Sequence, residues 1–179
     1  MKIFIAGPRV ITELDENIIR KLNNICEKKY EILIGDADGI DSCVQKHLKY
    51  NSYKNVVVYA SKGIARNNYG DWKVENVEIN RKLTGFDFYA EKDLKMAKDT
   101  DMGFMIWNGK SKGTFNNMIN LIKLNKSIIL YYLPNKKFYQ FKQAEDFESF
   151  LKTYIKLDGR LKKLLNEKEK QQYVQVSLF

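Results

Sequence analysis

Short apolar runs alternate with stretches of helical periodicity over the first 140 residues. The apolar runs predict strands at Lys2–Ala6, Glu31–Ile34, Asn55–Ala60, Met102–Trp107 and Ser127–Leu133. Apolar positions three or four residues apart predict helices at Thr12–Lys28, Ile40–Tyr50, Tyr89–Asp99 and Thr114–Asn125. Repeated strand–helix units are typical of a parallel sheet with helices on both faces. We therefore expect an α/β protein with three layers and a parallel sheet of about five strands.

Two parts of the chain depart from this alternation. Ser61–Phe88 is less regular, and long irregular stretches in a compact domain are often functional. After Pro134 the pattern predicts two further helices, at Ala144–Ile155 and Arg160–Lys170. The expected organisation is a ligand-binding domain over residues 1–140, a helical extension over 141–170 and a flexible tail over 171–179.

Length and composition narrow the class of protein. A chain of 179 residues suits one domain, and 44% hydrophobic residues exclude a disordered chain. The two cysteines form no CxxC pair, so we expect neither a metal site nor a disulfide framework. No apolar stretch approaches the ~20 residues of a membrane span, and no secretory signal is recognisable. We expect a protein of the cytoplasm, in a bacterial or phage-infected cell, with no membrane partner.

The formal net charge of +9 leaves two interpretations open. A positive field attracts anions, including nucleotides and nucleic acids. Much of the charge is Lys spread over the predicted helices, which is also typical of a solvated surface. DNA is therefore a possible partner, but an indirect one.

Three polar loops that contain glycine follow predicted strands or precede helices. They are Gly7-Pro8-Arg9, then Gly35-Asp36-Ala37-Asp38-Gly39-Ile40-Asp41, and finally Asn108-Gly109-Lys110-Ser111-Lys112-Gly113-Thr114. In an open parallel sheet such loops meet at the carboxyl edge, where ligands bind. The sequence therefore predicts one binding site formed by all three loops.

The residue types in these loops suit a phosphate ester. Glycine lets the backbone approach closely, and amides at a helix N-terminus, here Gly113 and Thr114, point at an anion. Arg9 is suited to a bidentate contact with phosphate. Asp38 or Asp41 would accept hydrogen bonds from ribose hydroxyls, and Trp107, Trp72 and Tyr59 are candidates for stacking on a base. The predicted binding residues are Gly7, Pro8, Arg9, Gly35, Asp36, Asp38, Gly39, Asp41, Trp107, Asn108, Gly109, Lys110, Ser111, Gly113, Thr114 and Asn117.

Each loop also has a structural interpretation. Asp36 and Asp38 are equally suited to capping the second helix. Gly109–Gly113 lacks the GxxxxGK[ST] pattern of a P-loop and is compatible with a surface turn. Trp107 is as well suited to a core position as to a stacking platform. The prediction of a site rests on the order of the three loops around the strands.

The chain also resembles a known superfamily over roughly residues 1–140. The matching segments are Ile5–Arg9, Ile34–Asp41, Val56–Ala60, Arg66–Trp72, Phe88–Thr114 and Asn116–Tyr132. In this order they resemble the YspA-like branch of the SLOG superfamily of Rossmann-like nucleotide-binding proteins. The resemblance implies a Rossmann-like fold and a nucleotide-derived ligand between the loop after the first strand and the Gly-Thr loop. SLOG branches include N-glycosidases acting on nucleoside monophosphates and sensors of nucleotide or NAD-derived signals in phage defence, and relatives imply a homo-oligomer.

Two positions depart from the family pattern. Hydrolases and transferases of the superfamily resemble GGxGTxxE, with a catalytic Glu three residues after the Thr, where this chain has Asn117. An amide cannot act as a base or nucleophile, so an enzyme would need another carboxylate, such as Glu91 or Asp41. Asn108 stands where this branch resembles WDG, and the lost charge leaves two expectations open: a weaker contact with a ribose or a metal, or a more anionic ligand.

The last five residues, Gln175-Val176-Ser177-Leu178-Phe179, resemble the pentapeptide that binds the bacterial sliding clamp. Two apolar anchors in a groove carry most of the affinity of such a contact. The alternative is that Leu178 and Phe179 pack on their own domain.

These observations give three hypotheses about function. In the first, the protein binds a nucleotide or NAD-derived phosphate ligand as a sensor or sequestering module, tethered to the replication sliding clamp. In the second, it is a nucleotide N-glycosidase or a ribosyl or deoxyribosyl transferase. In the third, it is an adaptor for DNA replication or repair with a vestigial pocket.

Overall fold

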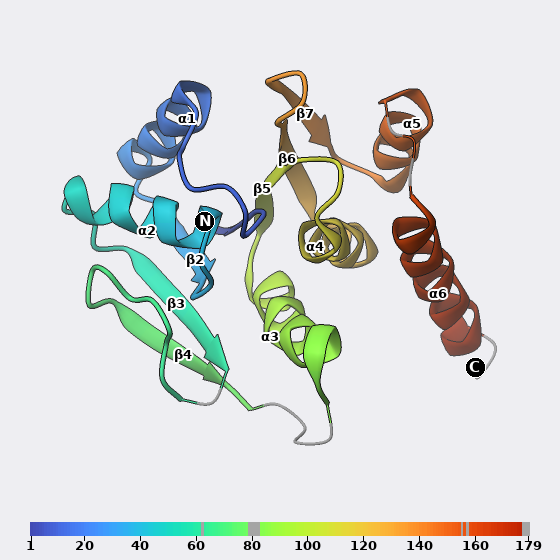
Figure 1. Cartoon of the computed structure of the whole chain (residues 1–179), viewed down its shortest axis with the longest axis horizontal. Coiled ribbons are helices and arrows are strands. Elements are labelled where there is room, and N and C mark those ends of the chain that lie inside the picture. The colour runs from blue at the N-terminus through green and yellow to red at the C-terminus, as the bar shows by residue number, and fades with distance from the viewer. Residues whose placement is uncertain (62, 79–82, 155, 157, 177–179) are drawn as a thin grey trace.

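A seven-stranded sheet with helices on both faces organises the computed structural model (Figure 1). The structure describes residues 1–61, 63–78, 83–154, 156 and 158–176. The strands are β1 (Lys2–Ala6), β2 (Glu31–Gly35), β3 (Val56–Ser61), β4 (Lys73–Val77), β5 (Met102–Trp107), β6 (Ser127–Tyr132) and β7 (Lys137–Phe141). The helices are α1 (Glu16–Glu27), α2 (Ile40–Tyr50), α3 (Gly85–Asp99), α4 (Lys112–Lys123), α5 (Ala144–Tyr154) and α6 (Gly159–Val176).

The strand order β4-β3-β2-β1-β5-β6-β7 identifies the place where a ligand site is expected. From β1 the chain moves outward through β2, β3 and β4, and then returns so that β5 pairs with the other side of β1. Strands β1 to β6 are parallel, and β7 is antiparallel to β6. The order reverses between β1 and β5, and ligands of open α/β sheets bind at this switch point.

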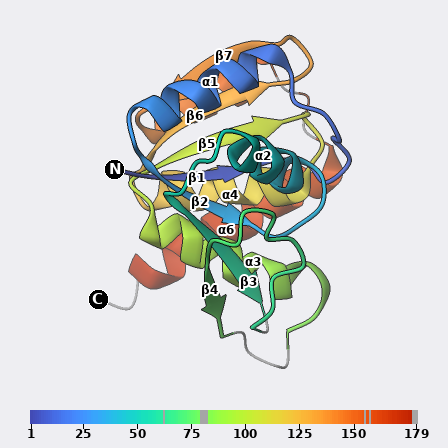
Figure 2. The same cartoon turned by 90° about the vertical axis from the view of Figure 1, so that its left-hand side faces the viewer.

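Successive side chains of each strand point to opposite faces of the sheet, so the hydrophobic core has two layers. In β1, Ile3 and Ile5 belong to a cluster with residues of α1 and α2. Phe4 and Ala6 point to the opposite face and belong to a cluster with residues of α3, α4, α5 and α6. Successive side chains of a strand face opposite sides, so each strand contributes to both layers. The second view shows α1 and α2 on the other side of the sheet from α3 and α4 (Figure 2).

The predicted class, an α/β Rossmann-like fold with three layers, is confirmed, and the sheet is larger than predicted. Strand β4 lies within the stretch that looked irregular, because the edge segment Lys73–Val77 is mostly polar and has no fully buried residue. Strand β7 was not predicted either, since it is a short edge strand with one buried residue, Phe141. An edge strand has one neighbour, so its sequence carries little of the burial pattern that identifies a central strand.

Two helices, α1 and α3, begin at other residues than predicted. Helix α1 begins at Glu16 rather than Thr12, because the Asp15 side chain accepts a hydrogen bond from the Asn17 amide (2.9 Å) and caps the helix. Helix α3 begins at Gly85, four residues before the predicted Tyr89.

The C-terminal extension packs into the same core as the strands. Phe147 and Phe150 of α5 and Leu161 and Leu164 of α6 are buried in the cluster that contains Phe4 and Met105. Helix α6 continues to Val176, into the segment predicted as a tail. Ser177, Leu178 and Phe179 of the clamp-like pentapeptide lie outside the described residues.

Candidate functional site

A cavity of about 660 Å³ opens at the carboxyl edge of the sheet, at the switch point between β1 and β5. Its walls come from the loops after β1, β2 and β5, from one side of α3, and from the first turns of α4 and α6. This volume lies within the range of small-molecule sites in proteins. The three loops predicted to converge are therefore brought together at one site.

The loop after β1 is held tightly against the start of α2. The Ile40 amide donates to the Pro8 carbonyl (3.2 Å), and Gly39 has a positive φ of 79°. A Cβ at Gly39 would lie 2.4 Å from the Arg9 backbone, so no side chain fits there. The contact fixes the backbone of Arg9 at the edge of the cavity.

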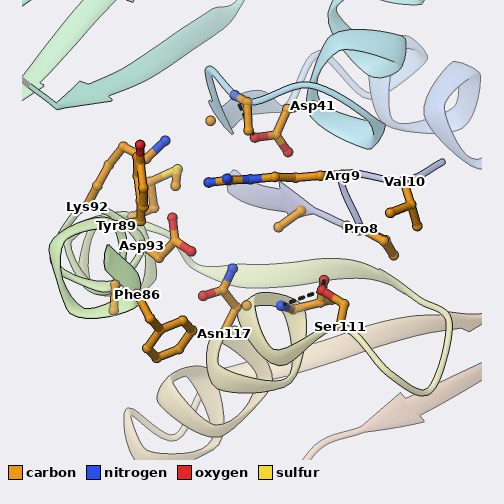
Figure 3. Close-up of a pocket in the computed structure, with 18 of the residues that line it drawn as sticks. Pro8, Arg9, Val10, Asp41, Phe86, Tyr89, Lys92, Asp93, Ser111 and Asn117 are labelled. Atoms are coloured by element: carbon orange, nitrogen blue, oxygen red, sulfur yellow. Dashed lines mark hydrogen bonds between the residues drawn. The ribbon is translucent and has the colours of Figure 1, made fainter. Parts of the chain in front are cut away.

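Arg9 supplies a positive charge to the cavity. Figure 3 shows its side chain extended across the cavity, with Asp41 on one side and Asp93 and Asn117 on the other. Its guanidinium lies 4.8 Å from the centre of the Tyr89 ring. Among the described residues no carboxylate forms an ion pair with it. The charge is therefore available for an anionic ligand.

Asp36 performs a structural role beside the cavity. Its carboxylate accepts hydrogen bonds from Lys92 Nζ (2.7 Å) and from the Arg66 guanidinium (2.7 Å), and its own side chain is 3% exposed. Burial alone would raise the pKa of Asp36, but the bonds from Arg66 and Lys92 outweigh it and hold the pKa far below its usual value. Asp38 is exposed and accepts from Asn67 Nδ2 (3.1 Å). Neither carboxylate caps α2, whose N-cap is Gly39.

Asp41 is the carboxyl that the second loop contributes to the cavity. It is nearly buried, and its Oδ2 accepts a hydrogen bond from the Ala37 amide (3.3 Å). Burial raises the pKa of Asp41 to about 7, against the opposing effect of the Lys92 charge and with a further increase from Asp93. A carboxyl with this pKa is protonated in a substantial fraction of molecules at neutral pH.

Helix α3 contributes a second carboxyl that the sequence did not single out. Phe86, Tyr89, Asp93 and Met96 recur at helical spacing and line the cavity, whereas Glu91 is exposed on another side of the helix. Burial raises the pKa of Asp93, and the Lys92 charge and a hydrogen bond with Asn117 oppose that shift. The period of 3.6 residues was the pattern that could have favoured Asp93 over Glu91.

The loop after β5 presents the N-terminus of α4. Asn108 Oδ1 accepts hydrogen bonds from the amides of Lys110 (3.0 Å) and Ser111 (2.9 Å), which shapes the turn. Ser111 is the N-cap, and its Oγ accepts a hydrogen bond from Thr114 Oγ1 (3.0 Å). The amides of Lys112 and Gly113 lie in the first turn, which offers them no intrahelical acceptor. Of these two residues Gly113 lines the cavity, and a Cβ added there would meet no atom within 4 Å, so no side chain crowds this turn at Gly113.

Asn117 lies one turn further along α4 and lines the same cavity. The residue is 3% exposed, and in the described part of the chain its Oδ1 has no hydrogen-bond partner. A buried amide oxygen without a partner is costly, which makes this atom a candidate acceptor for a ligand.

The predicted site residues are the sixteen binding residues and the candidate catalytic residue Glu91. Eleven of them line the cavity and six do not. Those that line it are Gly7, Pro8, Arg9, Gly35, Asp41, Asn108, Lys110, Ser111, Gly113, Thr114 and Asn117. Those that do not are Asp36, Asp38, Gly39, Glu91, Trp107 and Gly109.

The three aromatic residues considered for base stacking do not line the cavity. Trp107 is buried against Phe115, with 5.4 Å between the ring centres, and its Nε1 donates to the Ser111 carbonyl (3.0 Å). It therefore supports the loop before α4. Trp72 and Tyr59 are also buried, and the aromatic wall comes instead from Phe86 and Tyr89.

Two observations concern other parts of the chain. Gln175 and Val176 of the clamp-like pentapeptide lie in the last turn of α6.

No helix in the described part is both long and apolar enough to span a membrane.

Comparisons with known proteins identify a similar fold but no family. No protein-family model matches the chain, and no curated protein matches its sequence. A solved structure of DNA processing protein A from Helicobacter pylori, described as binding single-stranded DNA, is similar with a TM-score of 0.59. The two are 13% identical, and the match covers 96% of this chain and 81% of that one. The similarity establishes a shared Rossmann-like fold.

The different surroundings of Asp36 and Asp38 predict different effects of the same substitution. Asp36→Asn leaves the ammonium of Lys92 buried without a carboxylate, so we expect the free energy of unfolding to fall by about 3–5 kcal/mol. Asp38→Asn keeps an oxygen that can accept from Asn67 and lies at the surface, so its effect should stay within about 0.5 kcal/mol. Urea denaturation of both variants measures the difference. Equal losses would show that Asp36 does not hold the buried cation.

Proposed function

We propose that this protein binds a nucleotide or NAD-derived phosphate ligand in the cavity, as a sensor or sequestering module. One observation carries the proposal: Arg9 and the first turn of α4 face the same cavity around Asn117, whose buried Oδ1 has no partner in the described part. A guanidinium and helix N-terminal amides together suit a phosphate. The available acceptor at Asn117 suits a hydroxyl or amino group of the same ligand.

The rest of the cavity wall is compatible with the other parts of a nucleotide. Phe86 and Tyr89 of α3 supply apolar aromatic surface for a planar base. Asp41 and Asp93 supply carboxyl oxygens that can accept hydrogen bonds from ribose hydroxyls. Asn117 replaces the Glu on which the hydrolases of the resembled superfamily depend, and this favours binding without turnover.

Nucleotide binding should depend on Arg9. We expect Arg9→Ala to weaken the binding of AMP by roughly ten- to a hundredfold, because a charge-assisted hydrogen bond to phosphate is lost. Isothermal titration calorimetry measures the dissociation constants. Arg20→Ala is the matched control, since Arg20 is exposed on α1 and does not line the cavity. The binding proposal fails if neither AMP nor ADP binds the wild-type protein, or if both arginine variants bind as tightly as wild type.

A second candidate function is hydrolysis of the N-glycosidic bond of a nucleotide. It is favoured by the two cavity carboxyls, Asp41 and Asp93, both of which have raised pKa values. In a pair of neighbouring carboxyls one can hold a proton while the other is ionised, because two close negative charges repel. The ionised one would take a proton from water as its oxygen bonds to C1′. The protonated one would donate its proton to the base nitrogen, which leaves with the electron pair of the broken C1′–N bond.

A release assay for free base separates the two candidate functions. Binding without turnover predicts no base above the spontaneous rate. Hydrolysis predicts release that is lost in Asp41→Asn and in Asp93→Asn but kept in Glu91→Gln, because Glu91 is exposed outside the cavity. Its rate should also fall as the pH rises above about 7, where Asp41 loses its proton. Release that is lost equally in Glu91→Gln would contradict the assignment of the carboxyl pair.

We also propose that the C-terminal segment tethers the protein to the bacterial sliding clamp. The support is the sequence of Gln175–Phe179, whose first two residues form part of the last turn of α6. A third candidate function, an adaptor for replication or repair DNA with a vestigial pocket, shares this support. Its further support is a fold similar to that of a protein described as binding single-stranded DNA.

Clamp docking should depend on the two apolar residues of the tail. We expect Leu178→Ala combined with Phe179→Ala to abolish co-elution with the clamp in size-exclusion chromatography, since two apolar anchors carry most of the affinity of such a peptide. Gln172→Ala, just upstream of the pentapeptide, is the control and should keep the complex. Co-elution that survives the double substitution would refute the tether. Loss of nucleotide binding in the same variant would instead indicate that the tail packs on its own domain.

A further inference from the structure

One cation of the cavity wall comes from the C-terminal extension and is not used by the site described above. Arg160, in the first turn of α6, lines the cavity together with Arg9 and the first turn of α4. It lies outside residues 1–140, so the resemblance to nucleotide-binding proteins assigns it no role.

The backbone of Arg160 is held firmly in place. Its neighbour Leu161 is 1% exposed, and Leu164, one turn further along, is 4% exposed in the core cluster beneath the sheet. Asp158 caps the helix by accepting a hydrogen bond from the Leu161 amide (2.9 Å). The cavity therefore presents Arg160 from a packed helix rather than from a loose segment.

The Arg160 side chain can exchange its partner at little cost. Its guanidinium donates to Asp158 Oδ2 (2.8 Å), and its side chain is 76% exposed. An ion pair in water contributes little to stability, so a ligand phosphate can replace the carboxylate. Asp158 keeps its helix-capping contact when Arg160 turns away.

One phosphate does not need all the cations of this cavity. Arg9 and the first-turn amide of Gly113, both from residues that line the cavity, can together bind a single phosphoryl group. Arg160 adds a further positive charge, and Lys110 also lines the cavity. A cavity of about 660 Å³ has room for a ligand larger than a nucleoside monophosphate.

We infer that the ligand is a nucleotide with two linked phosphoryl groups and that Arg160 binds the second of them. The inference rests on the proposed nucleotide-binding function and specifies its ligand class. In this arrangement Arg9 and the first turn of α4 hold the phosphoryl group next to the ribose, and Arg160 determines the preference for a diphosphate over a monophosphate.

The test compares monophosphates with diphosphates on full-length protein. Titration calorimetry with AMP, ADP, GMP and GDP gives the ratio of dissociation constants within each base. Wild type should bind the diphosphates roughly tenfold or more tightly than the monophosphates, as one charge-assisted contact predicts. Arg160→Ala should remove this preference and leave the monophosphate constants unchanged, and Arg160→Lys should restore part of it.

Lys162→Ala is the matched control, because Lys162 is an exposed cation of the same helix that does not line the cavity. It should keep the wild-type preference, and the thermal unfolding midpoints of all variants should agree. A diphosphate preference that is absent in wild type, or that survives in Arg160→Ala, overturns the inference while monophosphate binding still supports the proposed function. Absence of binding for all four nucleotides removes the proposed function and the inference with it.

Discussion

The candidate site depends on one buried charge, the ammonium of Lys92. Its side chain is 4% exposed and lies 2.7 Å from Asp36 Oδ1. A buried ammonium is costly without a carboxylate, so Asp36 must be ionised and in direct contact. Asp36 also binds Arg66, and it thereby joins the end of β2, helix α3 and the loop before β4 at one point.

The same ammonium opposes the effect of burial on the protonation of the two cavity carboxyls. Its charge lowers the pKa values of Asp41 and Asp93, but burial raises both of them by more. Asp36 is the carboxylate in direct contact with Lys92 Nζ. Asp41 and Asp93, which face the cavity, are attracted by the Lys92 charge only at longer range. Asp36 is therefore a structural carboxylate with a lowered pKa, and it lies beside Asp41 and Asp93, two candidate functional carboxyls whose pKa values are raised.

Much of the fold was predictable because central parallel strands are buried on both faces. Strands β1, β2, β3 and β5 read as continuous apolar runs, and a parallel sheet implied that the three loops meet at its carboxyl edge. The strand order, and with it the switch point between β1 and β5, was not predicted. The polar edge strand β4 gave no such pattern and was missed.

The site was predicted at the level of loops rather than individual contacts. Sequence places Asp36, Asp38 and Asp41 within six residues of one another, but it does not indicate which carboxylate meets a buried cation. That choice depends on Lys92, 56 positions away from Asp36 along the chain. The choice of Glu91 over Asp93 has another cause, because the helical spacing that places Asp93 on the cavity side with Tyr89 was present in the sequence and was not used.

Charge balance gives a physical reason for an amide at position 117. The cavity already contains Asp41 and Asp93, and the Lys92 charge is matched by Asp36. A third carboxylate next to the first turn of α4 would compete with an anionic ligand for Arg9 and would repel it from the amides of that turn. The neutral side chain of Asn117 adds no further negative charge near the guanidinium and still offers an oxygen to the ligand. Under the proposed binding function, an amide at this position favours an anionic ligand more than a carboxylate would.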